Sequence, residues 1–263
     1  MRISVNCPSY KRPKVETLDY LPFCKVWVCE TEAEAYRAAN PGFEENIIPC
    51  KKGIQGNLCR IRNHILDTEF EAGADVVLII DDDMRRVGYY ESEPGNRFGY
   101  VKHNVSTEDF LPFIEKYSRI CEGFGFKFWG LNCNFDALGY TQYNPFSTVA
   151  YIGGPFQCFL KGNECRYDET LPLKEDYDMS LQNLNKYRGI LRVNKFHYAC
   201  EQSTNKGGCA AIRNIEREKE QLQMLINKWG SRIVKNDMTD RSHSSGKKKK
   251  IDYNPVVNVP IKG

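Results

Sequence analysis

The stretch that decides the fold is Val76-Val77-Leu78-Ile79-Ile80-Asp81-Asp82-Asp83, in which five apolar residues run directly into three acids. A strand of this composition is buried on both faces, as in the parallel sheets of α/β proteins. The carboxylates at its end must lie at the rim of the sheet, where a cation or a donor balances their charge. Because side chains alternate along an extended strand, Asp81 and Asp83 are expected on one side and Asp82 on the other. Oxygen ligands of this kind favour Mg²⁺ or Mn²⁺, and those ions favour a substrate that carries phosphates.

Strand and helix patterns alternate before this stretch. Residues 2–7 and 25–29 have the composition of strands, and Ile47-Ile48 is a brief third candidate. Thr31-Glu32-Ala33-Glu34 forms a capping box that opens a helix, and residues 57–72 place their apolar side chains on one helical stripe. This alternation predicts an α/β fold with a mostly parallel central sheet flanked by helices. Ligands of such sheets bind beyond the carboxyl ends of the strands.

The pattern changes after the acids. Residues 85–105 are expected to form an irregular loop, and Ser106 or Thr107 caps a helix that reaches about Cys121. The aromatic residues that follow are expected mostly in the core, although individual rings there could stack on a sugar or a base. The remaining elements are expected as strands at 127–131, 148–152, 156–160 and 190–193 and as helices at 174–187 and 210–229.

Composition limits the class of protein. The 263 residues, 41% of them apolar, are enough for one large domain with a sizeable core. Eleven cysteines are scattered without a Cys-x-x-Cys pair, and no apolar run has the length of a membrane span. We therefore expect free thiols, a cytoplasmic location and no membrane partner.

The basic charge is concentrated near the end of the sequence. Residues 241–263 carry six lysines and arginines against Asp252, whereas the formal net charge of the whole chain is +3. We expect a folded domain over residues 1–240 followed by a flexible basic tail at 241–263. The tail could lie on a polyanion such as DNA, or it could be a solvated lysine run that aids solubility.

Five short motifs follow one another in an order that carries a resemblance. They are Pro8-Ser9-Tyr10-Lys11-Arg12-Pro13, Arg60-Ile61-Arg62-Asn63, Asp81-Asp82-Asp83, Tyr167-Asp168-Glu169 and Glu175-Asp176. Over about residues 2 to 200 this order resembles the GT-A glycosyltransferases. The Ile-Asp-Asp-Asp-Met core and the later Glu-Asp helix look more narrowly like the TET-associated glycosyltransferase family. Members of that family are associated with phages and with enzymes that hydroxylate DNA pyrimidines.

The resemblance implies a role for each acid. Asp83 resembles the carboxylate that binds a metal ion on the donor diphosphate, and Asp81 resembles its partner facing the ribose. Asp82, beside them, is expected to accept hydrogen bonds at the rim of the donor site. Asp176 resembles the base that takes the proton from the acceptor hydroxyl, with Glu175 as the second choice. The alternative for these two acids is compensation of the helix dipole.

His197 is the expected third metal ligand, since many GT-A enzymes draw a ligand from the strand after the Glu-Asp helix. A structural role in the core is the alternative for a lone histidine. A zinc site that uses His197, Cys200 and Cys209 is a weaker possibility, because the spacing fits no usual finger.

Nucleotide recognition is expected from polar groups near the carboxyl ends of the first strands. Arg12 offers a fork to a phosphate, and the glycines around Gln55 lead to a helix N-terminus that favours an anion. The expected donor-binding residues are Pro8, Ser9, Arg12, Glu30, Gln55, Arg60, Asn63, Asp81 and Asp82.

The resemblance implies a metal-dependent glycosyltransferase that moves a sugar from a UDP-sugar to a 5-hydroxymethylpyrimidine in DNA, such as 5-hydroxymethylcytosine. Residues 1–84 would form the nucleotide-sugar-binding half and residues 85–240 the acceptor half, in the host cytoplasm if the protein is viral. The cofactor would be Mn²⁺ or Mg²⁺. The alternatives are transfer to a protein, lipid or glycan hydroxyl, and a non-catalytic DNA-binding module. A binding module does not explain the acids at the rim, which would repel phosphates without a metal ion.

Overall fold

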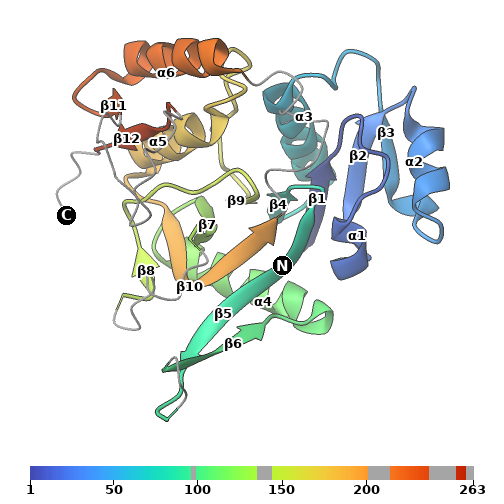
Figure 1. Ribbon diagram of the computed structural model, residues 1–263, viewed down its shortest axis with the longest axis horizontal. Helices are drawn as coiled ribbons and strands as arrows, with labels where there is room; N and C mark the ends of the chain where they lie inside the picture. Colours follow the sequence, from blue (N-terminus) through green and yellow to red (C-terminus); the bar gives the residue numbers. More distant parts are fainter. Residues whose placement is uncertain (96–98, 135–143, 201–213, 237–252, 259–263) are drawn as a thin grey trace, which may run out of the picture.

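The computed structural model describes residues 1–95, 99–134, 144–200, 214–236 and 253–258 (Figure 1). Over these residues the core is a ten-stranded sheet in the order β3-β2-β1-β4-β9-β7-β10-β5-β6, with β8 paired to β10. The strands are β1 (Ile3–Pro8), β2 (Lys25–Cys29), β3 (Ile47–Cys50), β4 (Val76–Ile80), β5 (Met84–Ser92), β6 (Tyr100–Asn104), β7 (Phe128–Asn132), β8 (Phe146–Ser147), β9 (Phe156–Leu160) and β10 (Leu191–Cys200).

The first half of the sheet follows the predicted alternation. Strands β3, β2, β1 and β4 are parallel, and every residue of β4 is fully buried. The connecting elements are α1 (Thr17–Tyr20), α2 (Ala33–Ala39), the short η1 (Glu44–Asn46) and α3 (Leu58–Glu71). The N-cap Asn57 begins α3 by accepting hydrogen bonds from the backbone amides of Cys59 and Arg60. The α/β fold predicted from the sequence is confirmed.

The second half of the sheet mixes strand directions. Strand β9 runs antiparallel to β4 and β7, β7 runs parallel to β10, and β5 runs antiparallel to both β10 and β6. The sheet is therefore mixed, with its longest parallel block in the first half. In Figure 1 the β5–β6 hairpin projects from the body of the domain, on the side away from β2 and β3.

Two expectations for this half were wrong. Residues 85–105 were expected as a loop, but they contain most of β5 and all of β6. Their alternation is hard to read, because Arg86 and Gly88 occupy one face of β5 where apolar residues would signal a strand. Residues 148–152 were expected as a strand, but the ladder there ends at Ser147. The amide of Ile152 donates instead to the hydroxyl of Ser180 in α5 (Glu175–Tyr187), 3.2 Å away.

Helices cover both faces of the sheet. Helix α4 (Thr107–Gly123) packs on one face, where Phe110 and Ile114 are buried in the hydrophobic core. Helices α3 and α5 (Glu175–Tyr187) pack on the other face. The expected cap of α4 is confirmed, since the Ser106 hydroxyl accepts the amide of Asp109 at 3.1 Å. None of the helices in the described part of the chain is long and apolar enough to cross a membrane.

A separate apolar cluster lies at the C-terminal side, and its buried members are Leu171, Leu181, Leu222, Leu225 and Val234. Helix α6 (Ile215–Trp229) and the strands β11 (Val234–Asn236) and β12 (Pro255–Val257) surround it, and β12 pairs antiparallel with β11. Residues 253–258, which the sequence placed in the basic tail, therefore contribute to this folded part of the chain. The rest of the expected tail, at 241–252 and 259–263, lies outside the described residues, as does Cys209.

Candidate active site

The three acids lie at the carboxyl end of β4, as predicted, but the strand ends before them. Strand β4 stops at Ile80, Asp82 and Asp83 form a turn, and β5 begins at Met84. Strand alternation therefore does not carry through the three acids. Arg12 contacts both Asp82 and Asp83, whereas Asp81 contacts Arg62. The turn divides the acids into a pair shared by Arg12 and a single residue held by Arg62.

Asp82 is hydrogen-bonded to the loop after β1. Its Oδ2 accepts the Ser9 hydroxyl at 2.5 Å, and its Oδ1 accepts the Arg12 guanidinium at 2.5 Å. Burial raises its pKa to about 7, and the charge of Arg12 limits the shift. Both oxygens are thus used inside the protein, in agreement with the interpretation of Asp82 as a hydrogen-bond acceptor at the rim.

Asp83 has one oxygen in use and one without a partner. Its Oδ2 lies 3.3 Å from Arg12 Nη1, while its Oδ1 is buried without a hydrogen bond to any of the described residues. The Cys200 thiol at the end of β10 lies beside this carboxylate, and burial raises the pKa of that thiol far above its ordinary value. An unpartnered buried carboxylate oxygen is costly, so this atom is suited to a ligand or an ion.

Arg62 connects the acids of β4 to those of α5. Its side chain is 1% exposed, and its Nη2 lies 3.2 Å from Asp81 Oδ1 and 3.1 Å from the carbonyl of Gly154. Its Nη1 lies 3.2 Å from Glu175 Oε1. The ring of Tyr167 lies 5.5 Å from its guanidinium carbon. One buried cation thus fixes the spacing between two acidic segments that are far apart in the sequence.

Arg62 was not among the functional residues expected from the sequence. Arg60 and Asn63 were expected from the same motif, and the apolar side chains of the helix were expected to form its buried stripe. Arg62 lies four residues after Leu58 and four before Leu66, so it belongs to that stripe. Its position on an apolar stripe was the signal in the sequence that could have revealed this role, because an arginine that is buried there requires acidic or carbonyl partners.

The two acids of α5 occupy different environments. Glu175 is 7% exposed and bound to Arg62, and burial together with Asp176 raises its pKa to about 8. Asp176 is half-buried, and its Oδ2 accepts the hydroxyl of Tyr151 and the amide of Gly154. Burial beside Asp176 keeps the Tyr151 hydroxyl protonated by raising its pKa. Of the two acids, Asp176 is the more accessible to a substrate.

The environment of Glu175 predicts a pH-dependent stability. Its pKa is higher in the folded chain than in the unfolded chain, so the folded state binds the extra proton between about pH 4 and 8. Its contribution to the free energy of unfolding is present at low pH and is lost as the pH rises through about 8. The Glu175→Gln variant should lack this loss when urea unfolding is followed across that range. Glu220→Gln, on the exposed side of α6, is the control, and equal slopes for wild type and Glu175→Gln would contradict the prediction.

Most of the expected donor-binding residues gather near the acids, but several are engaged in structure. Gln55 donates to the carbonyls of Ser9 and Trp27, and the Asn63 amide bonds to the backbone of Tyr167 in both directions. Arg60 is exposed and pairs with Glu169 at 2.8 Å. Glu30 is exposed and accepts the amide of Lys52, and Pro8 ends β1. Within this set, Ser9 and Arg12 directly contact the acids of the turn.

His197 lies apart from the acids. It pairs with Gly88 in the middle of β5, whereas Cys200 pairs with Met84 next to Asp83. Three residues along a strand correspond to about 10 Å. The charged groups that lower the pKa of His197 are Lys102 and Arg86, not carboxylates, and burial is the main cause of that shift to about 4. The geometry thus separates His197 from the other two proposed metal ligands.

Two of the aspartates that follow β4 offer oxygen atoms of the kind that a divalent cation prefers. Within the described ranges no group of three or more His, Cys, Asp and Glu side chains could hold a metal ion. The unpartnered Asp83 Oδ1 and the Asp81 carboxylate, whose side chain is 34% exposed, are hard oxygen ligands. Mg²⁺ often takes only one or two carboxylates, and substrate phosphates and water complete its coordination.

The fold and the two acidic segments define the class of protein as a glycosyltransferase with a GT-A-like α/β fold. The sequence model of the TET-Associated Glycosyltransferase family matches residues 21–208, from before β2 to beyond β10. The chain belongs to this family. No curated protein matches the sequence.

Several solved structures are similar to this chain at low identity. S. aureus TarS 1-349 is 16% identical with a TM-score of 0.43, over 75% of this chain and 59% of that one. The same TarS fragment in complex with UDP is 14% identical, with a TM-score of 0.41 over 86% of this chain and 66% of that one. A197 from STIV is 11% identical, with a TM-score of 0.40 over 76% of this chain and 85% of that one. The chain thus spans about three fifths of the first TarS structure.

Proposed function

We propose that this glycosyltransferase moves a sugar from a UDP-sugar to the hydroxyl of a 5-hydroxymethylpyrimidine in DNA. The observation that carries the proposal is the bridge made by Arg62, because it holds a donor-side acid, Asp81, and an acceptor-side acid, Glu175, on one cation. The family supplies the type of reaction. The acceptor is supported by the family's association with enzymes that hydroxylate DNA pyrimidines.

Each residue of the site has a defined task under this proposal. Asp83 and Asp81 would hold a divalent cation, which when bound neutralises the charge that develops on the leaving diphosphate. Asp176 takes the proton from the acceptor hydroxyl as that oxygen attacks the anomeric carbon of the sugar. Tyr151 and the amide of Gly154 orient the carboxylate of Asp176 for this transfer. Arg62 positions the two acidic segments through its contacts with Asp81 and Glu175.

A transfer assay tests the function directly. The protein is incubated with a panel of nucleotide sugars, Mn²⁺ and duplex DNA that contains 5-hydroxymethylcytosine or 5-hydroxymethyluracil, and the nucleosides are weighed by mass spectrometry after digestion. We expect the mass of one sugar residue on the modified base, dependence on the added cation, and no product on unmodified DNA. Consumption of the donor with no mass gain on any base would overturn the DNA acceptor in favour of a protein, lipid or glycan hydroxyl.

A further inference from the structure

The face of the β5–β6–β10 ribbon that points away from α4 carries a group of cations. Residues opposite one another in the ladders share a face, so His197, Gly88 and Asn104 lie together, and Lys102 lies beside Tyr90. On the other face Phe196 packs against Phe113 of α4 and against Tyr89. We call Arg86, Lys102 and His197 the ribbon cluster.

His197 is the buried centre of this cluster. It is 2% exposed, yet its Nε2 has no hydrogen-bond partner within the described part of the chain. Its ring lies across Gly88, where an added Cβ would approach Nε2 to 2.6 Å, and it stacks on Tyr90 with 5.1 Å between the ring centroids. Because Gly88 has no side chain, the imidazole fits against the strand, and stacking on Tyr90 fixes the orientation of the ring. A polar atom held this firmly without a partner is suited to a ligand.

The two cations of the cluster also lack acidic partners. Arg86 Nε is buried without a hydrogen bond, and among the described residues neither Arg86 nor Lys102 forms an ion pair. Partial burial and the charge of Arg86 lower the pKa of Lys102, so the two cations repel one another. The same two charges and burial keep His197 neutral by lowering its pKa. An anion placed between these groups would relieve the repulsion and satisfy the unpartnered nitrogens.

We propose that the ribbon cluster binds a backbone phosphate of the nucleic-acid acceptor. An arginine and a lysine beside a neutral hydrogen-bonding imidazole suit a phosphodiester oxygen. Tyr90 and Tyr100, whose centroids lie 5.0 Å apart, border the cluster and offer aromatic surface of the kind that stacks on bases. The projecting hairpin in Figure 1 suits a polymer that extends beyond the reaction centre. This inference rests on the proposed DNA acceptor and assigns one of its contacts.

The position of the cluster favours the acceptor over the donor as the source of the phosphate. His197 and Lys102 lie opposite Gly88 and Tyr90, four and six residues along β5 from Met84, which corresponds to about 13 to 20 Å from the start of the strand after Asp83. A diphosphate bound at the aspartates would therefore leave the ribbon cluster free.

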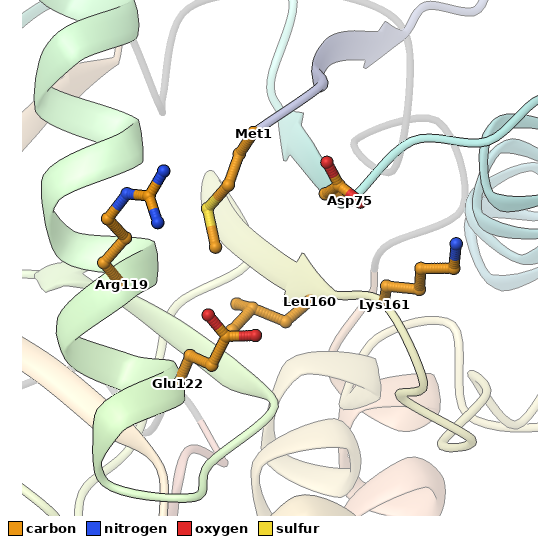
Figure 2. Close-up of a pocket in the computed structure, with 6 residues that line it drawn as sticks. All are labelled: Met1, Asp75, Arg119, Glu122, Leu160 and Lys161. Carbon is orange, nitrogen blue, oxygen red and sulfur yellow. The ribbon is translucent and has the colours of Figure 1, made fainter.

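A second group of charged side chains, which differs from the ribbon cluster in having partners, lines a cavity at the amino ends of the strands. Figure 2 shows Asp75 and Arg119 in this cavity of about 460 Å³ at the amino ends of β1 and β4. There Arg119 pairs with Glu115 and Asp75 accepts the amide of Arg2, so these charges are already satisfied. The cavity therefore supplies control residues for the ribbon cluster.

The test measures DNA binding without relying on sugar transfer. A short fluorescein-labelled duplex of unmodified DNA is titrated with wild type and with Arg86→Gln/Lys102→Gln, and UDP binding with Mn²⁺ is followed by calorimetry. We expect DNA affinity to fall about tenfold or more and the salt dependence of binding to drop by about one to two counterions. The affinity for UDP should stay the same. The matched control is Arg119→Gln/Lys161→Gln, which removes two cations from the cavity in Figure 2 and should leave DNA affinity unchanged.

The outcomes separate the inference from the proposed function. Unchanged DNA affinity in the ribbon variant overturns the inference even if wild type glycosylates DNA. An equal fall in UDP affinity also overturns it, because the phosphate would then belong to the donor. Weakened DNA binding without any sugar transfer to DNA supports the ribbon site and contradicts only the proposed acceptor. Arg86→Lys, which keeps the charge, should retain most of the affinity; if it binds as poorly as the double variant, the loss reflects damage to the hairpin and the inference falls.

Discussion

Asp176→Asn is expected to lower kcat by about 10²- to 10⁴-fold while UDP binds with unchanged affinity. The substitution keeps the size of the side chain and its hydrogen bond from Tyr151 but removes the group that accepts a proton. Burst and steady-state assays on hydroxymethylated DNA would measure kcat, and calorimetry would measure UDP binding. The expected pattern is a loss in kcat, because proton removal belongs to the reaction and not to donor binding.

Two further variants make the assignment of Asp176 specific. Asp67→Asn removes an exposed carboxylate that pairs with Arg166 on the surface, and it should keep full activity. Tyr151→Phe should cost far less than Asp176→Asn, since it removes only the group that orients the base. If Asp176→Asn kept kcat within a few fold of wild type, Glu175 would become the candidate base, and the corresponding loss should then appear in Glu175→Gln.

Arg62→Met should lower the free energy of unfolding by about 3–5 kcal/mol, because it leaves the Asp81 carboxylate without its buried counter-charge. Glu175 and the carbonyl of Gly154 each lose a hydrogen-bond donor. Urea unfolding gives the magnitude. The same variant should also lose transfer activity, since the two acidic segments no longer share an anchor.

Two comparisons isolate the electrostatic part of the effect of Arg62. Arg119→Met breaks an exposed pair with Glu115 on α4 and should cost less than about 1 kcal/mol. Above about pH 8 the double variant Arg62→Met/Glu175→Gln should recover part of the lost stability, because a buried glutamine needs no proton to stay neutral. A cost of Arg62→Met no larger than that of Arg119→Met would show that the buried bridge is not important for folding.

The sequence predicted the part of the fold that follows simple burial. Strand β4 is apolar throughout and lies in the middle of the sheet, so its pattern and that of α3 were sufficient for the α/β class. The β5–β6 hairpin was missed because its exposed face carries Arg86 and Gly88, and the need for that glycine depends on His197, which is more than a hundred residues away. The need for a glycine at position 88 becomes visible only when β5 and β10 are paired in the folded structure.

For the candidate site, the sequence predicted where the acids lie but not which residues they contact. The positions of Asp81, Asp82 and Asp83 at the sheet rim followed from the strand that precedes them. Their division between Arg12 and Arg62 did not, because it depends on a turn that begins immediately after β4. The tertiary pairing of β10 with β5 places His197 with cations and Cys200 with Asp83, and spacing along the sequence does not reveal this.

The pairing of β12 with β11 has a practical consequence for protein engineering. Tyr253 and Val257 pack on the same apolar cluster as Tyr177, which stacks on Tyr151 at 4.2 Å. A shortened chain that stops before Tyr253 would uncover that cluster next to the helix of Asp176. To study the lysine run at 247–250, its charges should be neutralised by substitution, with the residues that follow kept in place.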